Sequence, residues 1–285
     1  MIGFSVLMEN RARDGRFQAE HGLSLLIRAD GRNILLDTGQ SGAFLHNAAA
    51  LGIHPGDITD IILSHGHYDH TGGLAALFET AAWPDKKRPG LICHPDVLSR
   101  RSLVREGEPV SLGISEASRV AAVSWPARFT REPLWLTERV CFLGEIPRLR
   151  PDLCSLVGEK VPSVWPDDEI LHSGQREADP IFDDSAVVVL TSRGLAVFTG
   201  CSHSGIVNII EYARVVSGIK NVQGVYGGFH FKTMPDRAVA ESVAYLEGLT
   251  PQHLFACHCS GDVLCEHPLQ RHLAAGDSMD FASCS

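Results

Sequence analysis

Residues 64–73 constrain this chain more than any other segment. They read Ser-His-Gly-His-Tyr-Asp-His-Thr-Gly-Gly and place four potential metal ligands within six positions: His65, His67, Asp69 and His70. The apolar run at residues 57–63 is typical of a strand, and residues 74–80 read as the start of a helix. Open α/β sheets place their sites on such loops, at the carboxyl ends of strands. So dense a set of imidazole and carboxylate groups predicts a metal site.

The spacing within this segment predicts how the ligands divide. His65 and His67 are two residues apart, so on extended chain both point to the same side and can chelate one cation. Asp69 and His70 follow a turn and can face a second cation. Two cations about 3.5–4 Å apart activate water and stabilise a leaving oxygen. We therefore expect one or two divalent metal ions per chain, zinc first, with iron, manganese or magnesium as alternatives.

The sequence His65-Gly-His67-Tyr-Asp69-His70 resembles the HxHxDH signature of the metallo-β-lactamase-fold hydrolases. The resemblance implies an α/β (α+β) fold, a four-layer αββα sandwich with two mixed β-sheets, outer helices and one or two metals at the sheet edge. Asp37, in Ile-Leu-Leu-Asp-Thr-Gly, resembles the family's early Asp beside the metals. The match extends from about residue 20 to residue 262 and weakens in the middle of the chain.

The residues within the motifs resemble one branch of this family more closely. Gly-Cys-Ser-His-Ser-Gly-Ile-Val-Asn, Gly-Gly-Phe-His and His-Cys-Ser-Gly are similar to the dihydropterin synthase-like branch. A member of that branch joins a dihydropterin-methyl diphosphate to an aminobenzene ribofuranosyl phosphate. Most relatives in the branch carry no established substrate, so the resemblance leaves the reaction open.

The resemblance implies a set of metal ligands drawn from three segments of the chain. His203 is expected to complete the His65/His67 set, and His258 to join Asp69 and His70. His230 is expected to be either a further ligand or a proton donor, and with Asp69 it is the candidate catalytic residue. Three other residues are open candidates for substrate contact: His21, Glu20 and His94. The remaining histidines are expected at the surface or in local hydrogen bonds: His46, His54, His172, His253, His267 and His272.

Cys201 is a departure from the family pattern. Cys201 follows the glycine in Thr199-Gly-Cys-Ser-His-Ser-Gly205. Many members of the family have an Asp at this position, and that Asp bridges two metals. A buried structural Cys is the expected reading, and a soft thiolate ligand is the alternative. Asp184 or Asp262 is a possible substitute for the missing carboxylate. The number of metals therefore stays open.

The strand and helix pattern predicts a single domain over residues 1–285. Hairpins are expected at residues 23–36 and 186–199, each followed by a helix, at residues 41–51 and 206–218, and the first residues read as a strand. Residues 83–180 differ, because they hold eleven of the 15 prolines and all four tryptophans. We expect this Pro/Trp-rich segment to be an insertion of short strands and loops that serves packing or forms one wall of the pocket.

Charge and composition limit the partners. The net charge of −9 argues against nucleic acid as the main partner. No stretch approaches the roughly 20 apolar residues of a membrane span, and the first residues do not read as a signal peptide. The eight cysteines form no disulfide-scaffold pattern, which favours a cytoplasmic protein with reduced thiols. A small-molecule substrate is expected, and the oligomeric state is not predicted.

Two mechanisms fit the expected ligands. A hydrolase would use a metal-activated water on a phosphoryl or ester centre, and this interpretation is preferred because it makes fewer claims. The alternative is a transferase of the dihydropterin synthase type, in which the diphosphate departs and a carbon atom attacks. A third reading is a non-catalytic, metal-dependent ligand sensor.

Overall fold

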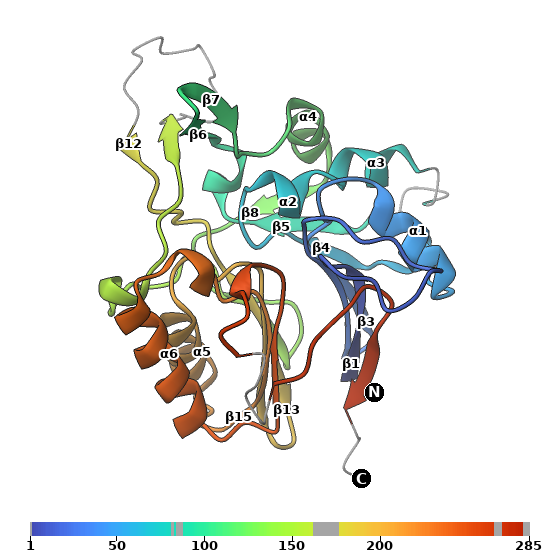
Figure 1. The fold of residues 1–285 in the computed structure, drawn as a ribbon. Coiled ribbons are helices and arrows are strands. Elements are labelled where there is room, and N and C mark those ends of the chain that lie inside the picture. Colours follow the sequence, from blue (N-terminus) through green and yellow to red (C-terminus); the bar gives the residue numbers. More distant parts are fainter. Residues whose placement is uncertain (1, 81–82, 84–87, 162–176, 265–269, 282–285) are drawn as a thin grey trace.

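Two β-sheets face each other in the computed structural model, which describes residues 2–80, 83, 88–161, 177–264 and 270–281 (Figure 1). The first sheet has seven strands in the order β17-β1-β2-β3-β4-β5-β8. Their bounds are β1 Ile2–Met8, β2 Ser24–Ala29, β3 Arg32–Leu36, β4 Asp60–Ile62, β5 Gly90–Cys93, β8 Ala127–Phe129 and β17 Ser278–Phe281. The second sheet has six strands in the order β16-β15-β14-β13-β10-β9. Their bounds are β9 Leu134–Trp135, β10 Val140–Phe142, β13 Ala186–Thr191, β14 Gly194–Thr199, β15 Val222–Gly227 and β16 His253–Ala256.

Helices cover the outer faces of both sheets (Figure 1). Those on the first sheet are α1 (Ala43–Ala50), α3 (Leu74–Glu79) and α4 (Glu116–Ser124), and they pack on it through Phe44, Leu77 and Ala122. Those on the second sheet are α5 (Ile206–Ser217) and α6 (Asp236–Gly248). One further short helix, α2 (Tyr68–Thr71), lies within the metal-ligand loop. The predicted four-layer αββα architecture is therefore confirmed.

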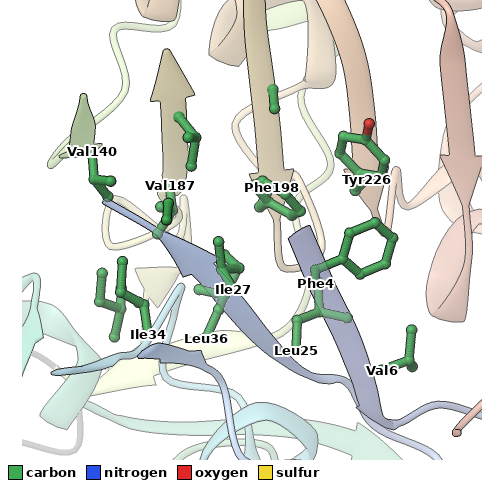
Figure 2. Close-up of a cluster of buried hydrophobic side chains, with 14 of the residues drawn as sticks. Phe4, Val6, Leu25, Ile27, Ile34, Leu36, Val140, Val187, Phe198 and Tyr226 are labelled. Atoms are coloured by element: carbon green, nitrogen blue, oxygen red, sulfur yellow. The ribbon is translucent and has the colours of Figure 1, made fainter. Parts of the chain in front are cut away.

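The core between the sheets follows from alternation along the strands. Leu25 and Ile27 of β2 face the second sheet, whereas Leu26 between them faces the helices. Figure 2 shows this inner layer, in which Phe4 packs against Phe198 and Tyr226 with ring centroids 5.6 and 5.0 Å apart. Since both sheets bury apolar faces here, they are held as one rigid support for the loops at their edge.

Both predicted hairpins form, and each leads into parallel strands. β2 pairs antiparallel with β3, and β3 pairs parallel with β4. Likewise β13 pairs antiparallel with β14, which pairs parallel with β15, and β15 with β16. The motif segments follow the carboxyl ends of these strands: residue 37 after β3, 64–73 after β4, 200–205 after β14, 228–230 after β15 and 257–261 after β16. Parallel pairing brings them to one edge of the sandwich.

Residues 83–180 are only partly an addition beside the fold. They supply β5 and β8 to the first sheet and β9 and β10 to the second. They also supply α4 and a separate four-stranded sheet in the order β12-β11-β6-β7, with bounds β6 Arg100–Arg105, β7 Glu108–Ser111, β11 Glu159–Val161 and β12 Glu177–Ala178. Trp125 stacks on Phe78 of α3, with ring centroids 3.6 Å apart. Trp165 lies outside the described residues. The single-domain boundary itself stays a prediction.

The described helices include none that is long and apolar enough to cross a membrane.

Arg101 in β6 ties the third sheet to the metal-ligand loop. Its guanidinium pairs with Asp179 and Asp183, at 2.5 Å in each case, and all three side chains are buried. Asp183 also accepts a hydrogen bond from the backbone N–H of Gly66, at 2.7 Å. A buried ion network of this kind therefore fixes the loop between His65 and His67.

We expect Arg101→Ala to lower the free energy of unfolding by about 3–5 kcal/mol, because it leaves two buried carboxylates unpaired. Urea unfolding measures this change. Arg105→Ala, at an exposed position of the same strand, should change it by less than about 0.5 kcal/mol. Equal losses in the two variants would contradict the assigned role of Arg101.

Candidate metal centre

The Asp37 carboxylate organises the metal-ligand loop from below. It accepts hydrogen bonds from the Ser64 backbone N–H, from Ser64 Oγ and from His70 Nδ1, each at 2.7 Å. Asp37 and His70 are both fully buried. Because one nitrogen of His70 is held by this carboxylate, the other, Nε2, is directed into the centre.

A first donor set consists of His65, His67 and His203. His65 Nε2 lies 3.0 Å from His67 Nδ1, and the ring centroid of His203 lies 4.9 and 4.8 Å from theirs. Burial lowers the pKa of His67 to about 3 and places the pKa values of His65 and His203 well below the usual value. All three imidazoles are therefore neutral near pH 7, which is the form that binds metal.

Two nitrogens of this set lack a partner in the described part of the chain. Nε2 of His67 and Nε2 of His203 are buried without a hydrogen bond. An unpaired buried polar atom costs about 1–3 kcal/mol. A divalent cation fits the donor set, because three neutral imidazoles converge where none of the described groups pairs with His203 Nε2.

A second donor set consists of Asp69, His70 and His258. His258 Nε2 lies 3.1 Å from Asp69 Oδ2 and 3.2 Å from His70 Nε2. Burial lowers the pKa of His258 to about 4. Burial alone would also lower the pKa of His70, but Asp69 and Asp37 outweigh it and raise that pKa to about 9. A cation bound here would take the place of the proton on His70 Nε2.

Cys201 lies between the two donor sets. Its Sγ is 3.1 Å from His70 Nε2, and the side chain is buried. Donor atoms of Cys201, His65 and His203 lie within 4.8 Å of one another, and so do those of Cys201, His70 and His258. Burial raises the pKa of the Cys201 thiol well above its usual value. The sulfur therefore lies close to histidine nitrogens that could bind the same metal ion. The sequence had instead favoured a structural Cys.

The two carboxylates suggested as substitutes for the bridging Asp lie elsewhere. Asp184 is buried and accepts a hydrogen bond from the Ser204 backbone N–H at 2.9 Å. Asp262 is 85% exposed and lies 3.9 Å from Arg11. Neither belongs to the groups of close metal-binding atoms found among the described residues.

A cavity of about 210 Å³ opens beside both donor sets. His230 faces it, with Nδ1 held by Ser155 Oγ at 2.9 Å and by Thr233 Oγ1 at 2.7 Å. Burial lowers the pKa of His230 to about 4. His21 lies at the rim, 3.2 Å from Asp69 Oδ2 and 54% exposed. The full lining is His21, His67, Tyr68, Asp69, Leu112, Val157, Cys201, His230, Lys232, Thr233, His258 and Cys259.

Sequence reasoning missed several of these residues. Lys232, Thr233 and Cys259 line the cavity, and each follows a predicted histidine by one to three positions, which was the available signal. Ser155 holds His230 from a segment with no distinctive motif. Leu112 comes from the loop after β7, and nothing in the sequence connects it with the centre.

The other predicted histidines and Glu20 lie outside the centre. His94 is buried and pairs with Glu145 at 3.1 Å, and Glu20 accepts hydrogen bonds from the backbone N–H groups of residues 40 and 41. His46 hydrogen-bonds to a backbone carbonyl, and His54 caps a short helix. His253 packs near aromatic rings, and His272 lines a separate small cavity. His172 and His267 lie outside the described residues.

Backbone strain collects at the centre. Asp37, Ser202, His230 and His258 have positive φ angles of 61, 59, 53 and 55°. Such conformations cost about 1–3 kcal/mol each and persist only where the surroundings impose them. Strain at four residues of the motif segments that meet at this edge of the sandwich is typical of a functional site.

Comparisons with known proteins agree with this geometry. The sequence model of the metallo-beta-lactamase superfamily matches residues 18–139. The 7,8-dihydropterin-6-methyl-4-(beta-D-ribofuranosyl)-aminobenzene-5'-phosphate synthase of Methanocaldococcus jannaschii is 31% identical, over 86% of this chain and 82% of that protein.

Solved structures are similar along the whole chain. Tm1679, described as a metal-dependent hydrolase of the beta-lactamase superfamily, is 26% identical with a TM-score of 0.79, over 99% of this chain and 100% of that one. Zn(2+)-bound PqqB from Methylobacterium extorquens has a TM-score of 0.57 at 14% identity, over 98% of this chain and 100% of that one, and shows the fold alone. By its sheet sandwich, its ligand motifs and its relatives, this chain belongs to the metallo-beta-lactamase superfamily and resembles its dihydropterin synthase-like branch.

Proposed function

We propose that this chain is a metal-dependent hydrolase of a small ester or phosphorylated substrate. The observation that carries the proposal is the convergence of buried neutral imidazoles, with Nε2 of His203 unpartnered among the described residues, beside a cavity. The description of Tm1679 as a metal-dependent hydrolase supports it. Water can reach the cavity, because His21 at its rim is 54% exposed.

The residues that would hold the metal are the two donor sets, His65, His67 and His203 on one side and Asp69, His70 and His258 on the other. When bound, a divalent metal lowers the pKa of water and polarises a phosphoryl or acyl oxygen. Imidazole and carboxylate ligands favour zinc, with iron, manganese and magnesium as the alternatives.

The chain's own side chains would orient the reacting groups. Burial alone would raise the pKa of Asp69, but His70, His21 and His258 hold it well below its usual value. Asp69 is therefore an anion that can orient an attacking water. With a pKa of about 4, His230 is neutral near pH 7, so it is not a cationic proton donor there. Its Nε2 is available as a hydrogen-bonding partner of the substrate or as a further ligand.

The cavity favours a small, negatively charged substrate. Its volume of about 210 Å³ suits a small molecule or one end of a larger one. Lys232 lines the cavity and supplies a cation that can receive a phosphate group. The net charge of −9 disfavours nucleic acid as the substrate.

We further propose a cytoplasmic location, because the six described cysteines are free thiols.

A second candidate function is the transfer reaction of the dihydropterin synthase type. The 31% identity to the Methanocaldococcus jannaschii synthase over 86% of this chain favours it. Both reactions break a bond to an oxygen leaving group, and Lys232 would hold a departing diphosphate in the same way. They differ in the acceptor, which is water in one case and a carbon atom in the other.

His67→Ala should abolish hydrolysis and lower bound metal. Loss of a group that merely orients a ligand lowers metal affinity or activity by about 10–100-fold, so loss of the ligand itself should lower activity by more than ~100-fold. Metal analysis of the purified variant and turnover of phosphodiesters, phosphomonoesters, lactones and thioesters measure this. His46→Ala, which removes an exposed histidine hydrogen-bonded to the Arg16 carbonyl and away from both donor sets, is the matched control. Full activity in His67→Ala would contradict the proposal.

Substrate consumption separates the two candidate functions. A hydrolase should turn over at least one ester or phosphoester with no second substrate. A transferase should consume a pterin-methyl diphosphate only when an arylamine is added, with diphosphate released in equal amount. Tight binding without turnover of either kind would instead favour a ligand sensor, and a purified chain that binds no metal would contradict both enzymatic functions.

A further inference from the structure

A pair of thiols lies at the base of the cavity. Cys201 follows β14, and Cys259 belongs to the short helix η6 (His258–Ser260) that follows β16. Cys259 Sγ lies 3.7 Å from the carbonyl oxygen of Cys201, and both side chains line the cavity. The two sulfur atoms and a ring nitrogen of His230 all lie within 4.8 Å of one another. Three donors from the ends of three adjacent strands therefore converge at one point.

The backbone around these thiols leaves room for the sulfur atoms. A Cβ at Gly228 would lie 2.5 Å from Cys259 Sγ and 3.4 Å from Cys201 Cα. Only glycine at this position lets Cys259 approach the segment that carries Cys201. The close approach is thus built into the end of β15.

His230 is oriented toward this pair by its own neighbours. Ser155 Oγ and Thr233 Oγ1 occupy Nδ1, so Nε2 is the nitrogen left for a ligand. The left-handed backbone at His230, with φ of 53°, sets the direction in which its side chain leaves the chain. Held imidazoles of this kind are typical of metal ligands.

The other buried thiols have different surroundings. Cys141 lies in an apolar cluster under α5, Cys93 lies in the apolar cluster under α1 and α3, and Cys257 lies in the core between the sheets. None of the three is grouped with other metal-binding side chains among the described residues. Packing alone explains these three cysteines but not Cys201 and Cys259.

We propose that Cys201, Cys259 and His230 form a soft-metal position in this centre, which takes Zn²⁺ or another thiophilic ion such as Cd²⁺ through two thiolates and one imidazole. The proposal rests on the proposed metal-dependent function and specifies which metals serve it. Thiolate ligands select zinc over magnesium and manganese. Cys201 Sγ also lies within 4.8 Å of donor atoms of His65 and His203 and of His70 and His258, so this ion would lie next to both donor sets.

Cobalt substitution of the full-length chain tests the proposal. The metal-stripped protein is titrated with Co²⁺, and thiolate-to-cobalt charge-transfer absorption is recorded with the bound metal counted separately. The wild type should show absorption from two thiolates. Cys201→Ser and Cys259→Ser should each lose about half of it, because each keeps one sulfur ligand of the two. Cys154→Ser is the matched control, since Cys154 is only partly buried and a hydroxyl can still donate to the Ser204 carbonyl.

X-ray absorption at the zinc edge of the wild type tests the same point without any variant. A sulfur shell at about 2.3 Å is expected beside the nitrogen and oxygen shell at about 2.0–2.2 Å. A wild type that binds metal and hydrolyses an ester but shows no sulfur ligand would contradict this proposal and leave the proposed function standing. Absorption that survives both substitutions would also overturn it, and a chain that binds no metal would overturn both.

Discussion

The hydrogen bonds of the buried Asp37 carboxylate are the interaction on which the centre depends. They join the end of β3 to the end of β4 through Ser64 and to the ligand His70. A Cβ at Gly200, just after β14, would lie 3.2 Å from Asp37 Oδ2, so the second sheet closes on the same point. A buried carboxylate is stable only when its oxygens are satisfied. The Asp37 carboxylate therefore positions the loop at residues 64–73, the ligand His70 and the contact between the two sheets.

Packing of the two sheets offsets the free energy that the strained and buried groups of the centre cost. Four residues of the motif segments have strained backbone, and several imidazoles are buried in neutral form. Neither feature stabilises the fold, so the stability must come from the apolar layer between the sheets (Figure 2) and from the clusters under the helices. Arg101 adds a buried ion network on the side of the third sheet.

Local sequence signals predicted the parts of the structure that depend on local rules. The hairpin predicted at residues 23–36 forms between β2 and β3, and the spacing of His65 and His67 correctly placed both in one donor set. The contact of Cys259 with Cys201 depends on parallel pairing of strands far apart in sequence, which no local pattern reveals. The distribution of residues 83–180 over three sheets has the same origin, since short strands carry weak periodicity. The resemblance to a known family supplied His203 and His258, which spacing alone would not have joined to residues 64–73.

The central claim is that His65, His67 and His203 share one cation. Anomalous diffraction at the zinc edge, from crystals of the full-length chain grown with Zn²⁺, tests it most directly. The account predicts an anomalous peak within about 2.0–2.1 Å of a ring nitrogen of each of these three imidazoles. Crystals grown with Zn²⁺ in which the three rings contact only protein and water, with no anomalous peak between them, would contradict it.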